Sequence, residues 1–134
     1  AILMKYVIHA YEQSYGGLHG IEDWRAVESD CYSDVEQEAI DMSIGVMESY
    51  AFIQEEITSQ ACFYCGCDVF DVENGNVDEE EFDSALNDAI NENVAYEIWE
   101  VEDSEFSILE INYMLANDPE GFVEEYCQNA KEYC

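Results

Sequence analysis

Basic residues are almost absent from this chain. Its 134 residues include only three lysines and arginines (Lys5, Arg25 and Lys131) against 33 aspartates and glutamates, which gives a formal net charge of −30. A protein that binds nucleic acid directly needs cationic side chains to replace the counterions around the phosphates. The composition therefore excludes direct nucleic-acid binding.

Histidine is scarce as well, with His9 and His19 as its two examples. The sequence contains no phosphate loop, nucleophile elbow or metal-protease helix. Pairs of carboxylates are unavoidable at this abundance, so they do not identify a glycosidase-type site. We expect a protein that is not an enzyme and that carries no cofactor.

Long apolar runs and a signal peptide are also missing. No apolar run approaches the roughly 20 residues of a membrane span. We therefore expect a cytoplasmic protein without membrane association. Met4-Lys5 looks like a natural start, so Ala1–Leu3 are expected to be additional residues. The length fits one compact acidic domain over residues 1–134.

Apolar residues, in contrast, are plentiful. The chain is 49% hydrophobic and has ten tyrosines, so it can bury a core, unlike the low-hydrophobicity acidic chains that remain disordered. Its acids are spread through amphipathic segments and are not gathered in a tail. A folded body with this charge repels itself, and solubility needs far less. A partner or an environment must explain the excess of negative charge.

The segment 34–61 has the strongest helical period, and the fold is organised around it. Its apolar residues recur at steps of three and four and form one stripe: Val35, Ala39, Met42, Val46, Tyr50, Ile53, Ile57 and Ala61. Ile40, Ile44, Met47 and Ala51 make a second apolar set on the opposite side. A helix that is apolar on two sides is buried between two layers or between two subunits, so the pattern also fits a homodimer.

A line of acids runs between these two apolar sides. Asp34, Asp41, Glu48 and Glu55 are each seven residues apart, which places neighbouring carboxylates about 10 Å from each other on a helix. Gly45 lies within this acidic line and is a position where the helix can bend or divide.

The remaining pattern predicts an α+β fold. Strands are expected at 2–11, 67–72 and 94–102, and helices at 78–92, 104–117 and from Pro119 through Phe122, Tyr126, Ala130 and Tyr133. Asp78, Ser104 and Asp118 are the expected N-caps. Residues 21–32 are expected to be irregular or a short helix. The prediction is a small sheet of two to four strands packed by about four helices, one of them long and central.

The N-terminal segment resembles a known family. A strand followed by Gly16-Gly17-Leu18-His19-Gly20, with Trp24 soon after, is similar to the opening of ArdA-type antirestriction proteins. Those acidic phage and plasmid proteins mimic DNA and block restriction enzymes. The resemblance covers about twenty residues, Trp24 lies further from Gly20 than in the family pattern, and this chain is shorter. The resemblance implies DNA mimicry without naming a target, and a strand followed by a glycine turn is the alternative interpretation.

Six cysteines raise the question of a metal site. Cys62-Phe63-Tyr64-Cys65-Gly66-Cys67 contains a zinc half-site, but a structural zinc needs four ligands, usually from two such pairs. We expect packed or free thiols and no metal, with zinc at Cys62, Cys65 and Cys67 as the less favoured alternative. An EF-hand aligned on Gly75 is rejected because Phe70 and Val72 would occupy ligand positions.

These observations favour one function. Proteins that bind DNA offer grooves of lysine and arginine, and lines of carboxylates could occupy such a groove. We expect an anti-CRISPR or antirestriction inhibitor, acting in the host bacterial cytoplasm if phage-encoded, whose partner is a basic nucleic-acid-binding protein such as a CRISPR effector or restriction enzyme. The expected partner-binding residues are Asp34, Asp41, Glu48, Glu55, Glu80, Glu81, Asp83, Asp88, Glu92, Glu97, Trp99, Glu100, Glu102, Asp103 and Glu105. A halophilic-type acidic domain and a cation- or metal-binding protein are the alternatives.

Overall fold

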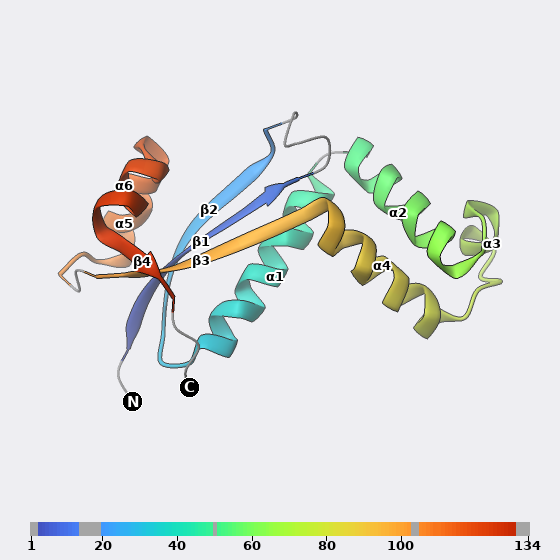
Figure 1. The fold of residues 1–134 in the computed structure, drawn as a ribbon, viewed down its shortest axis with the longest axis horizontal. Helices are drawn as coiled ribbons and strands as arrows, with labels where there is room; N and C mark the ends of the chain where they lie inside the picture. The colour runs from blue at the N-terminus through green and yellow to red at the C-terminus, as the bar shows by residue number, and fades with distance from the viewer. Residues whose placement is uncertain (1–2, 14–19, 50, 103–104, 131–134) are drawn as a thin grey trace. The chain divides into compact units, whose positions relative to one another are not determined.

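The computed structural model describes residues 3–13, 20–49, 51–102 and 105–130 and confirms the α+β class (Figure 1). The elements follow in the order β1 (Met4–Glu12), β2 (Glu22–Ser29), α1 (Tyr32–Glu48), α2 (Ala51–Cys65), α3 (Val69–Glu73), α4 (Glu79–Asn93), β3 (Val94–Val101), α5 (Ile108–Asn117), α6 (Pro119–Tyr126) and β4 (Cys127–Asn129). Within these ranges, no helix is both long enough and apolar enough to span a membrane.

The chain forms two compact units. Unit 1 combines residues 1–10, 22–42 and 96–134, and unit 2 combines residues 11–21 and 43–95. Unit 1 holds most of the sheet, the first part of α1, and α5 and α6. Unit 2 holds the end of α1 together with α2, α3 and α4.

The sheet has four antiparallel strands in the order β2-β1-β3-β4. β1 is an inner strand, as its apolar residues on both faces predict. β3 and β4 pair with Trp99 opposite Asn129 and Val101 opposite Cys127. The sequence prediction for residues 21–32 was wrong, because 22–29 form strand β2. Charged residues on either side make the alternation of Trp24 and Ala26 with polar positions hard to recognise in the sequence. Pairing with β1 stabilises the strand.

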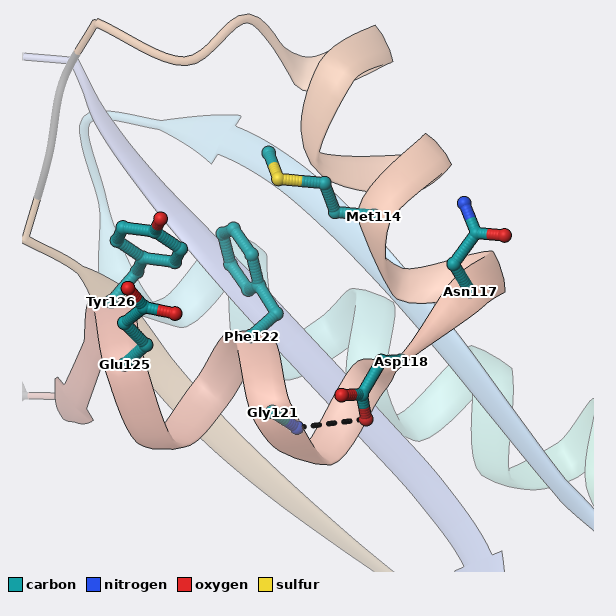
Figure 2. Close-up of a pocket in the computed structure, with 7 residues that line it drawn as sticks. All are labelled: Met114, Asn117, Asp118, Gly121, Phe122, Glu125 and Tyr126. Atoms are coloured by element: carbon teal, nitrogen blue, oxygen red, sulfur yellow. Dashed lines mark hydrogen bonds between the residues drawn. The ribbon is translucent and has the colours of Figure 1, made fainter.

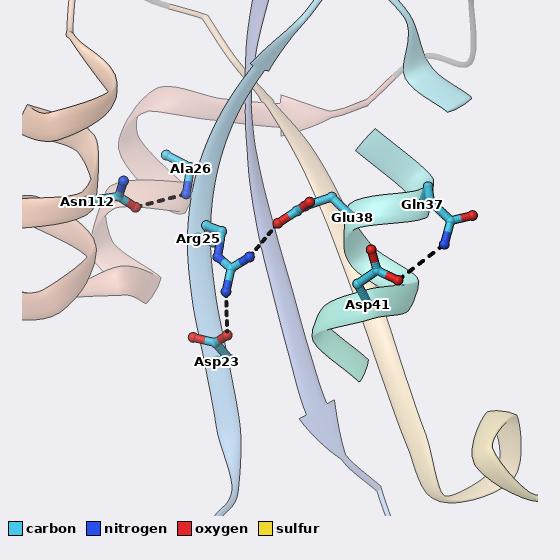
Figure 3. Close-up of polar contacts among 7 residues, drawn as sticks. All are labelled: Asp23, Arg25, Ala26, Gln37, Glu38, Asp41 and Asn112. Carbon is cyan, nitrogen blue, oxygen red and sulfur yellow. Dashed lines mark hydrogen bonds and ion pairs between the residues drawn. The ribbon is translucent and has the colours of Figure 1, made fainter. Parts of the chain in front are cut away.

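Helices cover both faces of the sheet in unit 1. Strand side chains alternate between faces, so the side chains of β1 at odd and even positions meet different helices. One buried cluster joins the sheet to α5 and α6, and on the opposite face the ring of Tyr6 lies 6.5 Å from that of Tyr32 on α1. Figure 3 shows α5 and α1 on opposite sides of β2. The cluster consists of Val7, Ala26, Val101, Ile111, Leu115 and Phe122.

The long central helix predicted at 34–61 is in fact two helices, α1 and α2. α1 ends at Glu48, where the Ser49 hydroxyl donates to the carbonyl of Val46 at 2.8 Å and so satisfies a terminal acceptor. Gly45 does not cause the division, since it lies inside α1. Burial of the main apolar stripe is nevertheless confirmed at Val35, Ala39, Met42, Val46, Ile53, Ile57 and Ala61. Tyr50 lies outside the described residues.

Unit 2 is built on the packing of α2 against α4. Ile53 and Ile57 of α2 are buried, as are Ala85 and Ala89 of α4. The buried side chain of Asn93 closes the contact by donating to Gln60 Oε1 at 2.7 Å and to the carbonyl of Ala89 at 2.8 Å. α4 is thereby held along its inner side, and its outer side carries charge.

The strand predicted at 67–72 was wrong, because 69–73 form the short helix α3. Asp68 is its N-cap and accepts from the backbone N–H of Asp71 at 2.9 Å, while Asp71 accepts from the backbone N–H of Asp68 at 3.2 Å. This reciprocal pair is a capping box, a local signal that outweighs the apolar character of the segment.

For the other helices, two predicted N-caps are confirmed, and the predicted start of α5 and end of α6 are corrected. Asp78 caps α4 and Asp118 caps α6, as predicted. α5 begins later than predicted, with Ser107 as its N-cap in a capping box with Glu110. Ser104 lies outside the described residues. α6 ends at Tyr126, so the prediction that the last helix continues through 130 was wrong.

Candidate protein-interaction surface

The outer side of α4 carries more exposed acidic residues than any other described helix. Asp78 accepts from the backbone N–H of Glu81 at 3.1 Å, and three acids fill the first turn. Carboxylates at a helix N-terminus are favoured by the helix dipole, yet further acids follow in the later turns, at Asp83, Asp88 and Glu92. Six are exposed along the helix: Glu79, Glu80, Glu81, Asp83, Asp88 and Glu92.

Glu92 is fixed in place at the end of this acidic surface. The Tyr64 hydroxyl of α2 donates to its Oε2. This hydrogen bond, with the nearby charges of Glu92 and Asp88, raises the pKa of Tyr64 above its ordinary value of 10.0. Gln13 donates to the carbonyls of Asn91 and Glu92 at 3.1 and 3.0 Å, so the last turn of α4 is also anchored.

The acidic line predicted on one helix is split between two. Asp34, Asp41 and Glu48 are exposed on α1, and Glu55 is exposed on α2. The seven-residue period therefore does not continue as one line past the end of α1. Gln37 donates to Asp41 at 3.2 Å, which orients that carboxylate along α1.

One of the few cations partly neutralises α1. Arg25 of β2 forms an ion pair with Glu38 of α1 and another with Asp23 at 3.6 Å (Figure 3). Beside it, the backbone N–H of Ala26 donates to the Asn112 side chain of α5 at 2.9 Å. Arg25 thus serves the fold and reduces the negative charge available near Glu38.

The acidic strand β3 presents its predicted residues unevenly. Glu97 and Glu102 are exposed, Trp99 is half-buried, and Glu105 is exposed beyond the strand. Glu100 is a correction: it is buried, with 8% exposure, because strand alternation directs it to the face opposite Trp99. Its Oε2 has no hydrogen-bond partner. Asp103 lies outside the described residues.

The cysteines are mostly free thiols. Cys62, Cys65, Cys67 and Cys127 are free. Cys31 is disulfide-bonded, contrary to the expectation of packed or free thiols throughout. Burial, together with Cys67 and neighbouring charges, raises the pKa of Cys62 to about 11. No group of three or more potential metal ligands among the described residues is arranged to hold a metal ion.

A cavity of about 300 Å³ between α5 and α6 has a structural explanation (Figure 2). Its carboxylate Asp118 accepts from the backbone N–H of Gly121 at 3.1 Å as the cap of α6. Its aromatic side chains, Phe122 and Tyr126, pack on each other with centroids 5.2 Å apart. These groups are engaged in capping α6 and in packing along it.

A second cavity of about 270 Å³, also in unit 1, combines aromatic rings with acids. His9 of β1 stacks on Trp24 of β2, with centroids 3.7 Å apart, and Trp24 stacks on Trp99 of β3 at 5.9 Å. The lining is completed by Glu97, Glu120, Val123 and Glu124.

Sequence reasoning found only part of this second cavity. Trp99 was predicted among the partner-binding residues, but Trp24 was noted only for a family resemblance and His9 only as one of two histidines. Their meeting depends on three adjacent strands pairing in the right register, which no local pattern reveals. The one available signal for this strand was the spacing of Trp24 and Ala26, which are two residues apart and so share a strand face.

Comparison with protein-family models, with curated proteins and with solved structures found no match. The Gly16–His19 part of the ArdA resemblance lies outside the described residues.

Proposed function

We propose that this chain is a nucleic-acid mimic that occupies the basic DNA-binding groove of a bacterial defence nuclease, either a restriction enzyme or an RNA-guided CRISPR nuclease. The observation that carries the proposal is the acidic side of α4. This helix of 15 residues contains six exposed carboxylates and no basic residue. It is about 22 Å long, which gives roughly one charge per 4 Å of axis. One strand of B-DNA carries a charge about every 3.4 Å, so the two charge densities are similar.

Fixed presentation of these carboxylates favours binding. Ala85 and Ala89 are buried against the rest of unit 2, Asp78 caps the start of α4, and Tyr64 holds Glu92 near its end. A partner therefore does not have to order the helix when it binds. Ordering costs are among the largest unfavourable terms in association, so a preformed acidic helix binds more tightly than a flexible acidic tail of equal charge.

The charge also explains how such a protein competes with DNA. A groove of lysines and arginines attracts either polyanion, and the approach of a strongly charged partner is accelerated by long-range electrostatics. Because duplex DNA depends on counterion release for much of its affinity, a carboxylate surface that pairs with the same cations displaces it.

The direct test is competition with purified nucleases. Restriction endonucleases and RNA-guided nucleases are loaded with fluorescent DNA, the protein is added, and displacement is followed by anisotropy. We expect displacement from the target nuclease and no binding of the protein to DNA alone. Inhibition of cleavage while the DNA remains loaded would contradict the mimicry mechanism.

Charge-matched variants then separate a specific surface from bulk charge. The α4 variant carries Glu81→Gln, Asp88→Asn and Glu92→Gln. Its control carries Glu28→Gln, Glu73→Gln and Glu125→Gln, three exposed positions outside α4 that give the same change in net charge. We expect the α4 variant to lose displacement and the control to keep it. Equal losses would mean that no particular face makes the contact.

A further inference from the structure

The cavity lined by His9, Trp24 and Trp99 adds a binding site that the acidic helix does not explain. We propose that it receives the side chain of an arginine from the partner protein. The inference rests on the proposed function in one respect, which is that the partner surface is rich in basic residues.

Three parallel aromatic rings form the apolar part of the cavity. The planes of His9 and Trp24 differ by 7°, and those of Trp24 and Trp99 by 14°. The 5.9 Å between the two indole centroids is less than the roughly 7 Å needed to insert a further flat group between them at ordinary contact distances. A ligand therefore lies against the outside of the stack and not inside it.

The acidic part of the cavity comes from two different elements. Glu97 belongs to β3, whereas Glu120 and Glu124 lie one helical turn apart on α6, and all three are exposed. Among the described residues, no lysine or arginine lines the cavity. Within unit 1, the side chain of Arg25 pairs with Asp23 and Glu38, and Lys5 donates to the carbonyl of Phe106. The three carboxylates consequently favour a cationic ligand.

The rings are held in place before any ligand arrives. His9 is 14% exposed and its Nε2 pairs with Glu22 at 2.8 Å, so one edge of the imidazole is fixed. The Nε1 atom of Trp24 is buried without a hydrogen-bond partner, so packing and stacking position this indole. A preformed aromatic wall reduces the ordering cost of binding.

The size and chemistry of the cavity select a guanidinium group. Its volume of about 270 Å³ is below the range of about 300–1,000 Å³ typical of pockets for drug-sized ligands, which suits a single side chain. Carboxylates beside an indole attract any cation. However, a planar guanidinium both stacks on tryptophan and pairs with two carboxylate oxygens, whereas a lysine ammonium is a strongly hydrated point charge.

The test uses short peptides and does not require the nuclease. Three peptides share one uncharged host sequence and differ at a single position, which is arginine, lysine or citrulline. Each peptide is titrated into the intact protein. Binding is read from the indole N–H signals of Trp24 and Trp99 in ¹H–¹⁵N spectra. We expect saturable shifts with the arginine peptide, binding about tenfold weaker with lysine, and none with citrulline. Equal binding of lysine or citrulline, or no saturable shift with arginine, would overturn the assignment.

Variants on α6 provide a control on the same helix. Glu120→Gln with Glu124→Gln should weaken arginine-peptide binding about tenfold. Glu125→Gln, on the same helix but lining the other cavity, should leave it unchanged. All three positions are exposed, so the fold is retained. Equal weakening by Glu125→Gln alone would overturn the proposal in favour of bulk charge. A normal peptide response combined with failure to displace DNA would contradict the proposed function and leave this site standing.

Discussion

The imidazole of His9 lies face to face with the indole of Trp24, with ring centroids 3.7 Å apart. The two residues come from adjacent strands, and each ring excludes water from one face of the other. Glu22 fixes the far edge of the imidazole at 2.8 Å. One pair of rings thus links the pairing of β1 with β2 to the shape of the cavity beside α6.

Removing this stack should destabilise unit 1. His9→Ala loses the ring contact and the Glu22 partner, and we expect the free energy of unfolding to fall by about 1 kcal/mol. His9→Phe restores a stacking ring without the hydrogen bond and should recover part of that loss. Urea unfolding followed by tryptophan fluorescence measures both. Identical losses in the two variants would show that stacking contributes nothing.

Neutralising the outer side of α4 should act on affinity and stability in opposite directions. The variant with Glu81→Gln, Asp88→Asn and Glu92→Gln should bind its nuclease less tightly and show a weaker dependence of affinity on salt, because fewer charge contacts are made. Its unfolding temperature in low salt should rise, since self-repulsion falls. Titrations between 50 and 300 mM salt, with calorimetry in parallel, test both effects. An unchanged salt dependence would contradict a charge contact at α4.

Burial of Glu100 should cost stability that an isosteric change recovers. Its Oε2 has no hydrogen-bond partner, and the residue is 8% exposed. Glu100→Gln removes the buried charge, and we expect a gain of about 1 kcal/mol in the free energy of unfolding. The exposed neighbour Glu102→Gln is the control and should change stability little. A loss of stability in Glu100→Gln would show that the carboxylate is better satisfied than its contacts indicate.

Gly121 should not tolerate a side chain. A Cβ atom there would lie 2.2 Å from Oδ2 of Asp118, so the carboxylate that caps α6 must move. Losing such a cap costs about 1 kcal/mol, and we expect Gly121→Ala to lower stability by at least this amount. Asp118→Ala together with Gly121→Ala should cost less than the sum of the two single changes, because both remove the same hydrogen bond.

Cys127 should make stability depend on pH in the alkaline range. Burial, assisted by the charge of Glu102, raises the pKa of this thiol from 9.0 to about 12. The folded pKa exceeds the unfolded one, so the stabilising contribution is complete below pH 9 and is lost as the pH rises toward 12. Urea unfolding at several pH values should show wild type losing its advantage over Cys127→Ala across this window. A constant difference between them would contradict the shift.

Local signals in the sequence located several elements of this fold. Asp118-Pro119 predicted the start of α6, and the apolar residues on both faces of β1 indicated an inner strand. β2 was missed because a strand that alternates Trp24 and Ala26 with charged residues becomes stable only when β1 pairs with it. The break after Glu48 was missed because the Ser49 hydroxyl replaces a helical hydrogen bond without changing the apolar period.

Prediction of the candidate sites depended even more on knowledge of the tertiary structure. The acids of α4 follow directly from a helix whose inner stripe is apolar, so their exposure could be predicted. Glu100 could not be separated from Glu97 and Glu102 until the orientation of β3 was known. The aromatic cavity needed the register of three strands and the position of α6, and none of these is encoded within one segment of the chain.

Asp118 ends α5 and begins α6, so no residue of a separate linker lies between these helices. The backbone of Asp118 is itself non-helical, with φ −154° and ψ 81°, so this single residue sets how α6 leaves α5. One residue inserted at this junction would displace Glu120 and Glu124 relative to the indoles of Trp24 and Trp99. The junction sets the direction of the helix, and with it the direction in which the two carboxylates point.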